Sequence, residues 1–152
     1  YAASAIALMG DSAGGNLAVL SSTAFDSRSH DPFDDVDRIS SRPDFAIPVY
    51  PGHLTMEHKN KTPKAVAAQE LNTDIVVSKQ VPPTLLVHAS DDPVDPVHYS
   101  EVYARELGKA GADVKLIVYE TGGHAFGVWK QGKDSDRWTE DAIRWLREIG
   151  IL

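Results

Sequence analysis

The chain has 152 residues, of which 42% are hydrophobic and 24% charged, and its formal net charge at pH 7 is −7. This is the composition of one globular domain long enough to bury a core, and its acidic balance argues against nucleic-acid binding, which needs a basic face. The absence of cysteine excludes disulfides, thiol nucleophiles and thiolate metal sites. No apolar run reaches the roughly 18 residues of a membrane span. The compartment is left open.

The chain begins with an apolar strand over 4–9, a sharp turn and a helix over 13–25. The turn reads G-x-S-x-G, with Ser12 at its apex. A glycine-rich turn is the plain alternative, but a serine between strand and helix is the context of a nucleophile elbow. Gly10 and Gly14 are expected there because side chains two positions before and after the serine would collide where strand and helix nearly touch. Since Ser12 lies at a helix N-terminus, the N–H of Ala13 is expected to form half of an oxyanion hole.

The next segment, 26–43, is polar and acidic and is predicted to be a surface loop. Its carboxylates lack the glycine and the distal glutamate of a calcium-binding loop, so no metal is expected there. A second strand follows over 44–50. Pro48 argues against a central position for this strand because proline cannot donate to a ladder.

Residues 51–83 are mixed, with a short helix predicted near 64–70. His53 directly follows the strand and is a candidate for the substrate pocket, although a plain loop position is an equal alternative. His53 and His58 do not have the H-E-x-x-H spacing of a zinc helix, so no metal site is predicted.

The third strand, 84–89, leads into a loop that carries three aspartates: Asp91, Asp92 and Asp95. His88, inside this strand, is predicted to be a hydrogen-bonded structural histidine. The carboxylates follow the C-terminal end of a strand, which is where open α/β sheets place their ligands.

A helix over 97–110, a strand over 113–119 and a helix over 136–149 complete the chain. The strand leads into a loop that contains His124 and Phe126, and Phe126 is a candidate pocket residue or a packing residue. Gly111 ends the first helix, and the apolar stripe of the last helix is predicted to be core. That stripe consists of Trp138, Ala142, Trp145, Leu146 and Ile149.

Alternating strands and helices predict an α/β fold with a mostly parallel sheet and helices on both faces. A serine nucleophile needs a base and an orienting acid. The chain supplies serine, aspartate and histidine in that order, which is the order in α/β hydrolases.

Three motifs carry a resemblance that covers essentially the whole chain. They are G-D-S-A-G-G-N at 10–16, H-A-S-D-D-P-V at 88–94 and G-G-H-A-F-G at 122–127. Together they resemble the C-terminal half of an α/β-hydrolase esterase of the carbohydrate-esterase-like and hormone-sensitive-lipase-like branches. The second motif also resembles prolyl-oligopeptidase-like enzymes. The resemblance implies strands 5 to 8 of the α/β-hydrolase fold with their helices.

The resemblance also implies site roles. Ser12 is the expected nucleophile, His124 the general base and then acid, and Asp92 the orienting carboxylate. The chain has Ala89 where the motif has glycine and Asp95 where it has valine. The acid therefore stays open between Asp92 and Asp95, with Asp91 third, and the offset from His88 favours Asp92. Asp11, beside the nucleophile, is a further pocket candidate.

The family also carries an H-G-G-G-type segment before the elbow, which supplies the second oxyanion donor. This sequence has none, and it begins at Tyr1. We therefore expect 1–152 to be a partial catalytic domain whose partner is its own N-terminal half. The isolated chain is expected to be inactive unless it is paired with that half.

The resulting hypothesis is a serine carboxylic-ester hydrolase that works through an acyl-enzyme and needs no metal or organic cofactor. The resemblance implies small acyl esters, acetyl above all, on small molecules or on a carbohydrate such as xylan. The alternatives are a prolyl-oligopeptidase-like peptidase and a non-catalytic hydrolase-like scaffold. The sequence leaves the acyl specificity and the oligomeric state open.

Overall fold

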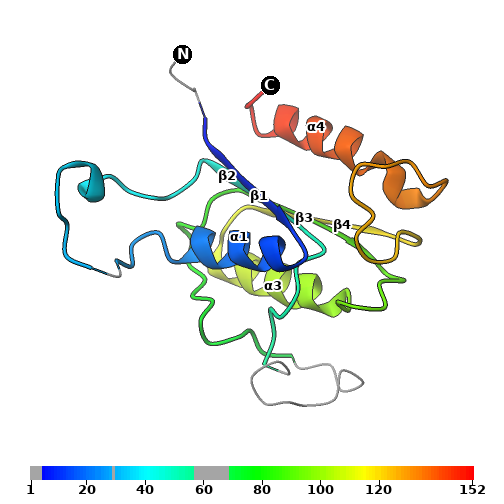
Figure 1. Ribbon diagram of the computed structural model, residues 1–152, viewed down its shortest axis with the longest axis horizontal. Coiled ribbons are helices and arrows are strands. Elements are labelled where there is room, and N and C mark those ends of the chain that lie inside the picture. The colour runs from blue at the N-terminus through cyan, green and yellow to red at the C-terminus, as the bar shows by residue number, and fades with distance from the viewer. Residues whose placement is uncertain (1–4, 29, 57–68) are drawn as a thin grey trace.

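A computed structural model describes residues 5–28, 30–56 and 69–152 of the chain (Figure 1). Four strands and three helices form the body: β1 (Ala7–Asp11), α1 (Ala13–Thr23), β2 (Phe45–Val49), β3 (Thr84–Ala89), α3 (His98–Ala110), β4 (Val114–Tyr119) and α4 (Trp138–Glu148). Short 3₁₀ turns lie at η1 (Val36–Arg38) and η2 (Asp134–Arg137). All bounds match the prediction within two residues except those of β1, which starts three residues later and runs up to the turn. Most of the helix predicted near 64–70 lies outside the described residues.

The four strands are parallel in the order β1-β2-β3-β4. Helices α1 and α3 cover one face of this sheet and α4 covers the other (Figure 1). Each face has its own apolar cluster, one built around Leu86, Tyr103 and Leu107 and the other around Val87 and Trp145. The predicted α/β architecture with helices on both faces is confirmed.

The last two helices follow their sequence patterns. Trp138, Ala142 and Trp145 of α4 are buried against the sheet, which confirms the core stripe. Helix α3 ends at Gly111, which has the left-handed φ of 77° that favours glycine at this position. The indole rings of Trp138 and Trp145 are therefore part of the core packing.

The expectation for Pro48 is wrong. Strand β2 lies between β1 and β3, so this proline is in a central strand. Pairing with β1 continues through Gly10 and Pro48, whereas pairing with β3 is interrupted around the proline. The strand keeps its place because the N–H groups on either side still pair. The N–H of Ala46 donates to the carbonyl of Pro83, just before β3, over 3.0 Å, and the N–H of Tyr50 donates to the carbonyl of Val87 in β3 over 2.7 Å.

The described residues of the acidic segment 26–43 extend away from the sheet and are largely exposed (Figure 1). Its carboxylates bind local backbone: Asp34 Oδ1 accepts from the N–H groups of Val36 at 2.8 Å and Asp37 at 3.2 Å. Within the described ranges, no cluster of three or more histidine, cysteine or acidic side chains could hold a metal ion. Among the same residues, no helix has the length and apolar character needed to cross a membrane.

His88 is the structural histidine that its position in β3 predicts. It is fully buried, its Nε2 donates to the carbonyl of Asp95 over 2.8 Å, and its Nδ1 accepts from the hydroxyl of Ser100 over 2.8 Å. Burial lowers the pKa of His88 below its ordinary value of 6.5, although the Asp95 carbonyl opposes this shift. The neutral ring is therefore the form that the fold accommodates.

This burial predicts a pH dependence of stability. Because the folded-state pKa of His88 is depressed below 6.5, the unfolded chain binds the proton more tightly. The contribution of His88 is complete above about pH 6.5 and is lost as the pH falls toward its folded-state pKa. We expect the free energy of unfolding, measured by urea denaturation, to fall between about pH 7.5 and pH 5.5.

The matched variants are His88→Gln and His30→Gln, since His30 lies in an exposed loop. The fall in the free energy of unfolding should be smaller in His88→Gln than in wild type, and in His30→Gln it should equal that of wild type. An equal fall in wild type and His88→Gln would show that other groups cause it.

Candidate active site

Ser12 lies at the apex of the turn between β1 and α1, as predicted. Its backbone has φ 50° and ψ −116°, a conformation that a non-glycine residue adopts only under strain. The N–H of Ser12 donates to the carbonyl of Val49 over 3.0 Å, which ties the turn to β2. The strand, the strained serine and the helix together form the nucleophile-elbow geometry.

The glycines around Ser12 have different roles. A Cβ on Gly10 would lie 2.3 Å from the carbonyl oxygen of Gly14, so no side chain fits there. A Cβ on Gly15 would lie 3.0 Å from both Pro51 Cα and Val49 O. A Cβ on Gly14 itself would meet nothing closer than Asp11 Oδ1 at 3.9 Å, so the expected collision at Gly14 is wrong. The close approach is made by the backbone of Gly14 against Gly10.

A chain of hydrogen bonds joins three loops at the C-terminal edge of the sheet. His124 Nε2 lies 2.9 Å from Ser12 Oγ, and His124 Nδ1 lies 2.8 Å from Asp92 Oδ2. A carboxylate only accepts, so Nδ1 carries the proton and Nε2 is left to accept from the serine hydroxyl. This is the tautomer that a general base needs.

Asp92 is held in place by its own loop. Its Oδ1 accepts from the N–H of Val94 over 2.8 Å and from that of Asp95 over 2.9 Å, which leaves Oδ2 for the imidazole. Its side chain is buried, and His88 Nε2 lies 3.5 Å from Oδ2. The carboxylate is therefore fixed in one orientation before any substrate binds.

The other two candidate acids lie elsewhere. Asp95 is buried, and its Oδ2 is 3.9 Å from His124 Nε2, on the side of the imidazole that faces Ser12. Asp91 is exposed and accepts from backbone N–H groups of the loop before His124. Of the three carboxylates, Asp92 has the geometry of an orienting acid.

Ala13 is the first residue of α1, so its N–H is one of those that have no acceptor within the helix. The positive end of the α1 dipole therefore lies next to Ser12. This position agrees with the oxyanion role expected for Ala13.

Asp11 borders a small cavity of about 230 Å³ beside the nucleophile. The cavity is lined by Met9, Gly10, Asp11, Val49, Tyr50, Gly127, Val128 and Trp138. The hydroxyl of Tyr50 donates to Asp11 Oδ2 over 3.0 Å. Burial, with a further contribution from the hydrogen bond to Asp11, raises the pKa of Tyr50 to about 12, so this hydroxyl keeps its proton at neutral pH.

Tyr50 is a site residue that sequence reasoning missed. Its ring meets the His124 ring edge-on with centroids 5.1 Å apart. The sequence places Tyr50 at the end of a strand, next to Pro51 and Gly52, and nothing local separates it from an ordinary core tyrosine. Its φ of 34° is visible only in the structure.

For Phe126 the structure favours the packing alternative, and its place in a substrate pocket stays a prediction. Phe126 is 2% exposed and packs edge-on against Tyr50, with centroids 4.5 Å apart. It therefore belongs to the core beneath the site. His53 is exposed with φ 57° in the loop after β2, and its place in a substrate pocket stays a prediction.

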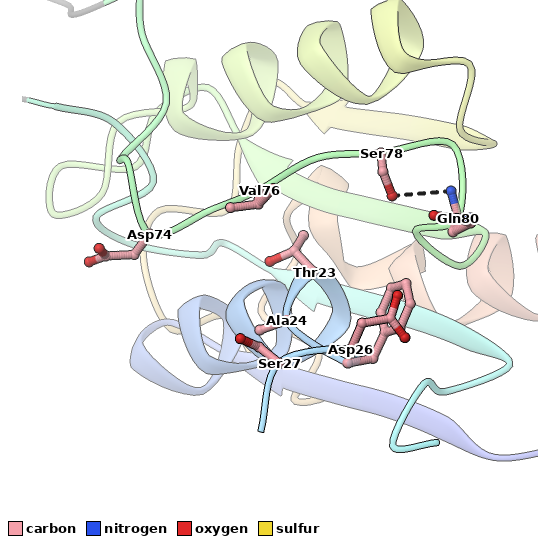
Figure 2. A pocket seen from close by; sticks show the side chains of 9 residues that line it. Thr23, Ala24, Asp26, Ser27, Asp74, Val76, Ser78 and Gln80 are labelled. Carbon is pink, nitrogen blue, oxygen red and sulfur yellow. Dashed lines mark hydrogen bonds between the residues drawn. The ribbon is translucent and has the colours of Figure 1, made fainter. Parts of the chain in front are cut away.

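A larger cavity of about 430 Å³ lies between the end of α1 and the segment before β3 (Figure 2). It is lined by residues that follow α1, such as Phe25 and Asp26, and by residues before β3, such as Val76 and Ser78. Both segments belong to the N-terminal edge of the parallel sheet, whereas Ser12, Asp92 and His124 follow strand C-termini. This cavity is therefore not part of the site.

A parallel sheet with a serine elbow, followed by aspartate and histidine loops, defines the α/β-hydrolase fold. The chain belongs to the prolyl oligopeptidase family, whose family model matches residues 1–150.

The chain is similar to an acetylxylan esterase of Xylanibacter ruminicola, with 29% identity over 160 residues that cover 95% of this chain and 30% of that protein. Among solved structures it is similar to an acetyl ester-xyloside bifunctional hydrolase from Caldicellulosiruptor lactoaceticus. The identity is 33% and the TM-score 0.73, covering 95% of this chain and 56% of the other.

It is also similar to a thermophilic esterase of the planctomycete Thermogutta terrifontis. There the identity is 25% and the TM-score 0.72, covering 96% of this chain and 56% of the other. The chain thus spans about a third of the curated relative and about half of these solved structures.

Proposed function

We propose that this chain carries the nucleophile, base and acid of a serine carboxylic-ester hydrolase. The observation that supports this most directly is the hydrogen-bonded series from Ser12 through His124 to Asp92, with 2.9 and 2.8 Å between the bonded atoms. All three residues follow the C-terminal ends of parallel strands, where this fold places its chemistry. The esterases among the similar proteins support the same class of reaction.

The proposed reaction is acyl transfer in two steps. Ser12 Oγ attacks the ester carbonyl while His124 Nε2 takes the hydroxyl proton, and Asp92 stabilises the resulting imidazolium. The N–H of Ala13 stabilises the negative charge on the carbonyl oxygen. His124 then gives its proton to the departing alcohol, and water repeats the sequence to release the acid.

We propose that the chain acts as part of a larger catalytic domain. Ile6 is 66% and Met9 is 62% exposed, and both lie in or beside β1, the edge strand of the described sheet. Apolar residues on a sheet edge favour pairing with a further strand. The part of the larger domain that contains this further strand would also supply the second oxyanion donor, because this sequence has no H-G-G-G-type segment.

The proposed substrates are acetyl esters of carbohydrates, because two of the similar proteins are an acetylxylan esterase and an acetyl ester-xyloside hydrolase. The second candidate is peptide hydrolysis, which family membership favours. Both reactions would use Ser12, His124 and Asp92, so the substrate that is cleaved distinguishes the two candidate functions.

The test compares acetate release from acetylated xylan with cleavage of a peptidyl-prolyl p-nitroanilide. We expect the ester to be hydrolysed and the anilide to be left intact. A fluorophosphonate probe followed by peptide mass spectrometry should place one adduct on Ser12. The measurements use the 152-residue chain and any longer form of the protein that contains it. Anilide cleavage without acetate release would favour the peptidase, and no adduct in either form would count against an enzyme.

A further inference from the structure

The loop that carries His124 is bound to the aspartate loop beside it. Beyond the paired strands β3 and β4, the N–H of Ser90 donates to the carbonyl of Tyr119 over 2.8 Å, and Ser90 Oγ donates to that of Glu120 over 3.1 Å. Next along the chain, Asp91 Oδ1 accepts from the N–H groups of Gly122 at 2.9 Å and Gly123 at 2.6 Å. The two loops are therefore joined up to the residue before the histidine.

The backbone around His124 contains a strained residue. Gly123, Ala125 and Gly127 have positive φ values of 68°, 57° and 52°. Glycine adopts a positive φ at little cost, but Ala125 carries a Cβ, so its conformation persists only when the surroundings hold it in place. The placement of the imidazole between these residues therefore depends on contacts from outside the loop.

A second contact acts after the histidine. The N–H of Gly127 donates to the hydroxyl oxygen of Tyr50 over 3.3 Å, and that hydroxyl donates to Asp11 beside the nucleophile over 3.0 Å. The Tyr50 ring meets the imidazole edge-on. Tyr50 thus joins the end of the histidine loop to the serine elbow.

We propose that Asp91 and Tyr50 are positioning residues that hold the His124 loop on either side of the imidazole. Asp91 bonds the backbone before His124, and Tyr50 bonds the backbone after it. Asp92 orients the imidazole ring itself. The two adjacent aspartates therefore hold different parts of the histidine loop, Asp91 its backbone and Asp92 the His124 side chain. The inference rests on the proposed function, because it assigns the purpose of this anchoring to proton transfer between Ser12 and His124.

A small displacement of the imidazole is enough to matter. Misplacing a catalytic group by about 1 Å can cost roughly 100-fold in rate. Asp91 is exposed and contacts the loop through hydrogen bonds rather than through the core, so its removal should affect geometry more than global stability.

The test uses Asp91→Ala, which removes the acceptor, and Asp91→Asn, which keeps an oxygen that can accept the same two N–H groups. The matched control is Asp34→Ala, because Asp34 also accepts from two backbone N–H groups but lies in the remote loop. Tyr50→Phe is the second variant, since it keeps the ring and removes the hydroxyl.

The first readout is the low-field proton resonance of His124 Nδ1–H, which reports the hydrogen bond to Asp92 whether or not the protein turns over substrate. The second is the rate of fluorophosphonate labelling, with kcat and KM for p-nitrophenyl acetate where turnover is found. In Asp91→Ala we expect the resonance to broaden or disappear and kcat or labelling to fall roughly 10- to 100-fold with little change in KM. Tyr50→Phe should act in the same direction, Asp91→Asn should restore most of the wild-type behaviour, and Asp34→Ala should match wild type.

An unchanged resonance and labelling rate in Asp91→Ala would overturn the proposal. So would an equal loss in Asp34→Ala, which would mark a general loss of stability, or an Asp91→Asn variant no better than the alanine. If wild type shows the resonance and Asp91→Ala loses it, while a longer form of the protein that contains the chain neither hydrolyses an ester nor takes the fluorophosphonate label, the anchoring stands and the proposed function fails.

Discussion

Ser12→Ala should reduce ester hydrolysis by roughly 10⁶-fold, because loss of the nucleophile removes the acyl-enzyme pathway. It should also abolish fluorophosphonate labelling. The Oγ of Ser12 makes no capping bond to α1, and the backbone of Ser12 is held by Val49 O, so the fold should tolerate the change. The measurement is kcat/KM for p-nitrophenyl acetate in an active form of the protein, with thermal unfolding as the check on folding.

Ser22→Ala is the matched control. Ser22 lies in α1, the helix that begins directly after Ser12. It is buried, and its hydroxyl finds no hydrogen-bond partner among the residues that the structure describes. The substitution is chemically identical but leaves the site untouched, so activity should stay within about twofold of wild type, as for a mutation outside the machinery. Full activity in Ser12→Ala would show that another residue is the nucleophile.

The second large effect is expected at the acid. Asp92→Asn should lower kcat by roughly 10⁴-fold, because an amide facing Nδ1 favours the tautomer in which Nε2 carries the proton. That tautomer cannot accept the proton of Ser12. Steady-state kinetics on p-nitrophenyl acetate give the comparison.

Asp95→Asn makes the same isosteric change in the same loop. Its Oδ2 is 3.9 Å from His124 Nε2 and does not contact Nδ1, so the loss should stay within about tenfold. Because Asp95 is buried, the thermal unfolding of the Asp95→Asn variant must be measured as well. A larger loss of kcat in Asp95→Asn than in Asp92→Asn, at equal stability, would transfer the acid role to Asp95.

Much of this molecule could be predicted because it depends on local pattern. The strand–G-x-S-x-G–helix turn, the alternation of strands and helices, and the end of α3 at Gly111 are each encoded within a few neighbouring residues. Period and turn chemistry are short-range properties, so they can be read without the fold. The order of serine, aspartate and histidine likewise needs only the chain.

Other features could not be predicted because they depend on distant segments. Pro48 is in a central strand because the neighbouring N–H groups of Ala46 and Tyr50 maintain the ladder to β3. The packing alternative for Phe126 is favoured because its ring meets the Tyr50 ring, which comes from another loop. Neither the low strand propensity of proline nor the position of Phe126 after His124 contains information about these long-range contacts.

The sequence by itself determined the fold class, the elbow serine and a short list of possible acids. Only the tertiary structure separates the geometries of the three aspartates, because the turn directs Asp91 toward backbone N–H groups, Asp92 toward His124 Nδ1 and Asp95 toward the Nε2 side of that ring. The bonds from Asp92 Oδ1 to the N–H groups of Val94 and Asp95 set that direction. The hydroxyl of Tyr50, which links two loops across the sheet, likewise becomes visible only once the strands are brought side by side.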